Sequence, residues 1–143
     1  MNRCPPNVWN AVRRDAAILE EQKIRYVLIG TAALAVQGIA VEVPDADFLV
    51  DKLPKVEAVD APETEGSSRT DCVATVVDGI KIDHIDVKTK KLRKKGFLET
   101  PTIVVDGVNV AAVRTVMAIK KAAGRPKDID FAFELASQVA EAA

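Results

Sequence analysis

The chain has 143 residues, a formal net charge of −1 and 48% hydrophobic residues, which favours one folded domain over residues 1–143 and disfavours a disordered chain. Cys4 and Cys72 stand apart, so the sequence offers neither a disulfide framework nor a cysteine metal site. The first residues lack the apolar core of a secretory signal, and no apolar stretch is long enough to cross a bilayer. We therefore expect a cytoplasmic protein with no membrane contact.

Two elements are predicted at the start of the chain. Apolar residues recur at helical spacing from Val8 to Leu19, which predicts an amphipathic helix with Asn7 as its cap. Residues 24–29 are rich in β-branched and aromatic side chains, which predicts a buried strand. This order favours an α/β arrangement.

The strand runs directly into Gly30-Thr31, and an alanine-rich helix is predicted over residues 32–37, closed by Gly38. A glycine and a hydroxyl group between a strand and a helix are typical of phosphate sites, because the backbone can approach the ligand and amides point outward. In the alternative interpretation, Gly30 only permits a tight turn and Thr31 only caps the helix.

Two carboxylates interrupt the apolar run of residues 43–50. On a strand Asp45 and Asp47 would project from the same face, where they repel each other unless a cation or solvent intervenes. Paired hard oxygens on a strand are a usual way to hold Mg²⁺ or Mn²⁺ against nucleotide phosphates. The alternative is an exposed strand end.

A further acid is expected on the strand that follows a predicted hairpin. Asp78-Gly79 suits a type I′ turn between two apolar runs, and Asp106-Gly107 repeats the pattern later in the chain. In the strand after Gly79, Asp83 and Asp86 differ in parity, so only one can face the acid pair. Asp83 is preferred because it alternates with Lys81, and Asp86 is the alternative.

Three other segments complete the prediction. His84 is expected to be a hydrogen-bonded structural residue, because no second histidine or cysteine stands at metal spacing. Residues 88–95 hold six basic residues in eight, a patch that could meet RNA or an acceptor's phosphates, or simply be solvated surface. Residues 113–123 and the segment after Pro126 are predicted to be helical. A mixed sheet with flanking helices is the expected architecture.

These residues together carry a family resemblance, which spans about residues 24–135. The glycine junction, the acid pair and the third acid resemble the nucleotidyltransferase fold of the DNA polymerase β type. The segment Lys120 to Asp128 is similar to the Lys-x-x-Ala and Arg-x-Lys-Asp motifs of the AbiEii-like nucleotidyltransferases, found among abortive-infection and toxin–antitoxin proteins. The resemblance implies an α/β (α+β) fold with a nucleotidyltransferase-like mixed β-sheet flanked by helices and a helical C-terminal segment.

The resemblance also implies roles for individual residues. Gly30 and Thr31 would hold the nucleoside triphosphate, and three acids would bind the divalent metal, Mg²⁺ or Mn²⁺: Asp45, Asp47 and Asp83. A C-terminal cluster would lie near the phosphates, with Lys120 and Arg125 binding nucleotide and Lys127 and Asp128 taking part in catalysis. The implied activity is transfer of a nucleoside monophosphate to a hydroxyl of a protein, RNA or small molecule.

The chain departs from the family pattern at identifiable positions. Val41 and Val43 stand where the family usually has an arginine and a threonine, and Phe131 stands where a second tail aspartate is expected. The alternative function is therefore a catalytically weakened module that binds a nucleotide or the partner protein of a toxin–antitoxin pair.

Overall fold

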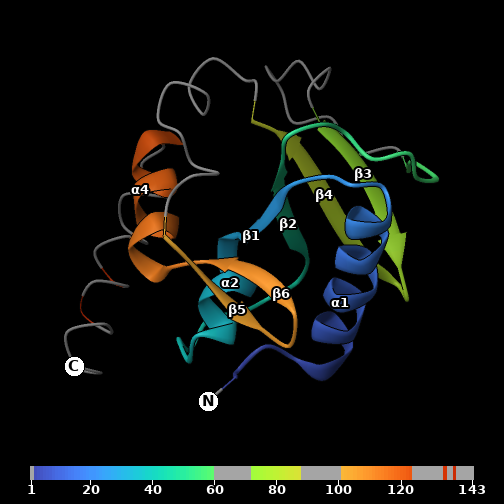
Figure 1. The fold of residues 1–143 in the computed structure, drawn as a ribbon. Helices are drawn as coiled ribbons and strands as arrows, with labels where there is room; N and C mark the ends of the chain where they lie inside the picture. Colours follow the sequence, from blue (N-terminus) through green and yellow to red (C-terminus); the bar gives the residue numbers. More distant parts are fainter. Residues whose placement is uncertain (1, 60–71, 88–100, 124–133, 135–136, 138–143) are drawn as a thin grey trace.

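The computed structural model describes residues 2–59, 72–87, 101–123, 134 and 137, drawn in colour in Figure 1. Among residues 2–59, 72–87 and 101–123 three helices accompany six strands, and residues 134 and 137 are also helical. In chain order these helices and strands are α1 (Pro6–Glu21), β1 (Tyr26–Ile29), α2 (Gly30–Val36), β2 (Ala46–Val50), β3 (Cys72–Val77), β4 (Ile80–Asp86), β5 (Thr102–Val105), β6 (Val108–Ala111) and α4 (Val113–Ala123).

The six strands form one mixed sheet in the order β3-β4-β2-β1-β6-β5. β1 runs antiparallel to β2 and parallel to β6, while β2 runs parallel to β4. The outer pairs, β3 with β4 and β5 with β6, are antiparallel hairpins. The predicted mixed sheet with flanking helices is confirmed.

Side-chain alternation gives the central strands two different faces. Phe48 and His84 point to the α1 face, where their rings stack with centroids 6.1 Å apart. Their neighbours Asp47 and Asp83 therefore project from the other face, which α2 contacts at β1 and β2. Figure 1 shows α1 lying along β3 and β4, with α4 on the other side of the molecule. The acids and the buried histidine thus lie on opposite sides of the same two strands.

Several turn predictions are confirmed by backbone geometry. Asp78-Gly79 and Asp106-Gly107 both join strands with two consecutive positive φ angles, as a type I′ turn requires. Gly38, with φ +95°, follows the end of α2. The two Asp-Gly pairs therefore correctly predicted both hairpin turns, and Gly38 correctly predicted the end of α2.

Two local expectations were wrong. Asn7 does not cap α1, because the helix already begins at Pro6, whose missing N–H costs nothing in the first turn, and no side chain caps it. Asp45 is not part of a strand, because β2 begins only at Ala46. Pro44 lacks the N–H group that a sheet ladder needs, so the chain bends at residues 44–45 before it joins the sheet.

Several predictions lie outside the described residues, namely the basic segment 88–95, Arg125, Lys127 and Asp128. Of the helix predicted after Pro126 only residues 134 and 137 are described, and both are helical. In the part of the chain that is described, no helix has the length and apolar character needed to cross a bilayer.

Candidate functional site

The centre of the site is a pair of carboxyl groups on neighbouring strands. The parallel register of β2 and β4 places Asp47 directly beside Asp83, and a hydrogen bond joins the two side chains. Two carboxyl groups can share such a bond only when one of them holds a proton. Asp83 Oδ1 is buried and has no hydrogen-bond partner within the described residues, so one oxygen of the pair retains unused lone pairs.

The surroundings of Asp47 strongly favour its protonated form. Burial raises the pKa of Asp47 to about 7. The charges of Asp45 and Asp83, and the hydrogen bond that protonated Asp47 donates to Asp83, act in the same direction. Burial also raises the pKa of Asp45, as does the charge of Asp83. The three acids therefore lie close enough for electrostatic repulsion between their carboxyl groups, although Asp45 lies on the bend before β2. Clustered acidic side chains that raise one another's pKa values are typical of cation-binding sites.

Gly30 closes the site on the side of α2. Its φ of +70° is a conformation that L side chains rarely adopt, and a Cβ atom there would lie 3.0 Å from Asp47 Oδ2. The strand–helix junction predicted to bind phosphate thus directly adjoins the acid pair. Thr31 follows as the second residue of α2 and is partly exposed.

Two lysines supply positive charge to the acids. Lys120 of α4 lowers the pKa of Asp47 against the larger effects of burial and neighbouring acids. Lys81 of β4 lies on the same face as Asp83, with Nζ 3.7 Å from Asp83 Oδ1, and also lowers the pKa of Asp45. Lys120 was predicted to belong to the site, whereas Lys81 was noticed in the sequence only as a marker of strand alternation.

The choice between Asp83 and Asp86 follows from register. Asp86 lies opposite Val50 in the β2–β4 ladder, and its odd spacing from Asp83 turns it to the other face of the sheet. Among the described residues, no three Asp, Glu, His or Cys side chains are arranged to hold a metal ion as they stand.

A buried pair on the opposite face anchors β4. His84 Nε2 lies 2.7 Å from Asp15 Oδ2, His84 Nδ1 lies 3.1 Å from the Val73 carbonyl, and both side chains of the His84–Asp15 pair are fully buried. Since the carbonyl oxygen can only accept, Nδ1 is the donor in its contact with Val73. The structural role predicted for His84 is confirmed. Asp15 was missed, although an acid at helical spacing within the apolar stripe of α1 was a usable signal.

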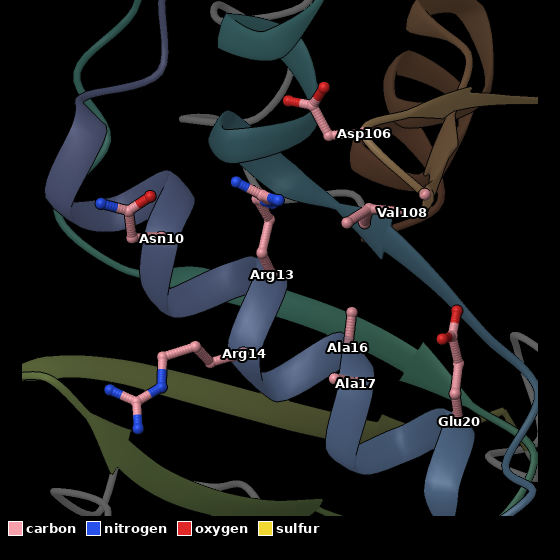
Figure 2. A pocket seen from close by; sticks show the side chains of 9 residues that line it. Asn10, Arg13, Arg14, Ala16, Ala17, Glu20, Asp106 and Val108 are labelled. Atoms are coloured by element: carbon pink, nitrogen blue, oxygen red, sulfur yellow. The ribbon is translucent and has the colours of Figure 1, made fainter.

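A pocket of about 500 Å³ lies elsewhere, between α1 and the β5–β6 turn (Figure 2). Arg13 points toward Asp106 there, while Arg14 points away and donates two hydrogen bonds to Asp78. Asp106 also accepts a hydrogen bond of 2.9 Å from Trp9 Nε1. Because none of the acids or glycines of the candidate site lines this pocket, it forms a separate surface feature.

Comparison with known proteins supports the fold. No protein-family model matches the chain, and no curated protein matches it. The chain is similar to the crystal structure of a Thermotoga maritima protein named a putative nucleotidyltransferase, with a TM-score of 0.58, 18% sequence identity and coverage of 96% of both chains. The chain therefore has a nucleotidyltransferase-like fold. A shared fold at this identity leaves the chemistry to be argued from the site.

Proposed function

We propose that this chain is a metal-dependent nucleotidyltransferase that transfers a nucleoside monophosphate from a nucleoside triphosphate to a hydroxyl group. The observation that carries the proposal is the partly buried Asp47–Asp83 pair beside Gly30, on a fold shared with a protein named for this activity. Strongly perturbed acid pKa values cluster at functional sites.

The donor set suits Mg²⁺ or Mn²⁺. Both ions prefer hard oxygen ligands, and Asp83 Oδ1 is a buried oxygen with no hydrogen-bond partner among the described residues. Asp47 and Asp83 would hold the metal once their shared proton is lost, and Asp45 would contribute from the bend before β2. Bound there, the metal would neutralise phosphate charge and lower the barrier to displacement at phosphorus.

The remaining residues would bind and orient the nucleotide. Gly30 lets the backbone approach the phosphates, and Thr31 adds a hydroxyl donor. Lys120 brings positive charge toward the same acids from α4. Within the AbiEii-like pattern, Arg125 would also bind nucleotide, and Lys127 and Asp128 would join the catalytic groups. An RNA or protein acceptor fits the basic segment 88–95, and partnership in a toxin–antitoxin pair fits the tail motif.

One observation favours the second candidate, a module that binds nucleotide without transferring it. Val43, which replaces a polar residue of the family pattern, is only 8% exposed and belongs to the hydrophobic core, and Val41 packs against that core. These two positions therefore support packing and supply no phosphate contact.

The proposal is tested by incorporation of label from each of the four nucleoside triphosphates into protein, RNA and small-molecule hydroxyl acceptors. We expect incorporation that requires Mg²⁺ or Mn²⁺ and is lost in Asp83→Asn. Asp86→Asn is the matched control, because it changes the same residue type on the opposite face of β4. Nucleotide binding without incorporation would favour the second candidate. Activity lost in Asp86→Asn and kept in Asp83→Asn would refute the assignment of the site.

A further inference from the structure

Lys81 is the one cation of the candidate site that lies on the same strand as an acid of the pair, counting only the described residues. Its Nζ is 3.7 Å from Asp83 Oδ1, and its side chain is 31% exposed against 14% for Asp83. Lys81 also acts on Asp45, so its charge serves two of the three acids. Backbone geometry fixes this arrangement, because residues 81 and 83 necessarily share a face of β4.

The contact between Lys81 and Asp83 is electrostatic and lacks a hydrogen bond. A distance of 3.7 Å exceeds hydrogen-bond length, and Asp83 Oδ1 remains without a hydrogen-bond partner in the described part of the chain. The lysine therefore offsets the negative charge of the site and leaves the lone pairs of this oxygen unused. A divalent cation could take those lone pairs directly, at the short distances that Mg²⁺ requires.

We propose that Lys81 is the resident counter-ion of the acid site, which stabilises the clustered carboxyl groups before a divalent cation binds and weakens metal binding in the absence of nucleotide. The inference rests on the metal site of the proposed function. A bound dication repels the ammonium group, and the flexible four-carbon stem lets that group turn away from Asp83 toward an anion such as the triphosphate.

The test is Mn²⁺ binding measured by calorimetry without nucleotide. Lys81→Met keeps the apolar stem and removes the charge, so we expect Mn²⁺ to bind three- to tenfold more tightly than to the wild type. Lys81→Arg keeps the charge and should stay within twofold of the wild type. Lys52→Met is the matched control and should change nothing, because Lys52 is exposed beyond the opposite end of β2.

A stability measurement gives a second readout that does not need activity. In EDTA, Lys81→Met should melt at a lower temperature than the wild type, because the acids lose their counter-ion. At saturating Mn²⁺ the difference should close, because the metal replaces the lost charge and stabilises only the folded state. Lys81→Gln provides a second neutral variant if the methionine variant does not fold.

The outcomes separate the two proposals. Equal Mn²⁺ affinity in the wild type and in folded Lys81→Met, or weaker affinity in the variant, would overturn the role of Lys81 and leave the metal site intact. Absence of Mn²⁺ binding in both proteins would overturn the metal site and the counter-ion together. Tighter binding in Lys81→Met with unchanged Lys52→Met would support the inference.

Discussion

The partly buried Asp47 makes the stability of the folded protein depend on pH, and a single substitution should remove this dependence. Its pKa is about 7 in the folded state, against an ordinary value near 4 in the unfolded chain. The folded state therefore retains a proton that the unfolded chain releases. The stability from this proton is fully present below about pH 4 and is lost as the pH rises through 7.

Asp47→Asn removes this titration while keeping the shape of a neutral carboxyl group and a donor toward Asp83. Between pH 5 and pH 8 the free energy of unfolding of the wild type falls by about 2–3 kcal/mol, because folded Asp47 keeps a proton that the unfolded chain releases. We therefore expect the stability advantage of the variant over the wild type to be about 2–3 kcal/mol larger at pH 8 than at pH 5, in the absence of metal.

The assay is urea unfolding in EDTA at both pH values, followed by the fluorescence of Trp9, the single tryptophan of the chain. Glu42→Gln is the control, because Glu42 is exposed on the loop before β2 and should alter stability little at either pH. A difference between Asp47→Asn and the wild type that is the same at pH 5 and pH 8 would refute the reasoning.

Other substitutions probe the neighbouring features. Gly30→Ala should cost about 1–2 kcal/mol in urea unfolding and abolish Mn²⁺ binding in calorimetry, because a Cβ at φ +70° is strained and displaces Asp47; unchanged metal affinity would contradict this. His84→Ala should destabilise the protein by about 3–5 kcal/mol, since it leaves the fully buried Asp15 without its partner, whereas replacing both residues by leucine should restore much of the loss. Equal losses in the single and double variants would argue against that pairing. Lys127→Ala should leave the melting temperature unchanged and lower nucleotide affinity or transfer at least tenfold, about 1.4 kcal/mol. Full binding and turnover in this variant would return the tail motif to a structural role.

Local sequence signals predicted much of the fold, because they rest on backbone chemistry that tertiary contacts rarely override. The two Asp-Gly turns and Gly38 occupy positive-φ positions where few other residues are comfortable. The preference for Asp83 over Asp86 also follows from local physics, since parity along a strand decides which face a side chain takes.

The parts that sequence reasoning missed depend on contacts between distant segments. Asp15 and His84 are 69 positions apart, and each taken alone looks like an isolated polar residue. The bend at Pro44 removed Asp45 from the strand, although the proline was visible in the sequence. The counter-ion position of Lys81 required the distance to Asp83 and the unpartnered oxygen, neither of which a sequence pattern records.

The central claim is that Asp47 and Asp83 together bind a divalent cation that holds a nucleoside triphosphate. It is tested most directly by the affinity for a fluorescent, non-hydrolysable nucleoside triphosphate with and without Mn²⁺, in the wild type and in Asp83→Asn. The account predicts at least tenfold tighter binding with Mn²⁺ in the wild type and loss of that gain in the variant. Equal affinity with and without Mn²⁺, or an undiminished gain in a natively folded Asp83→Asn protein, would contradict it.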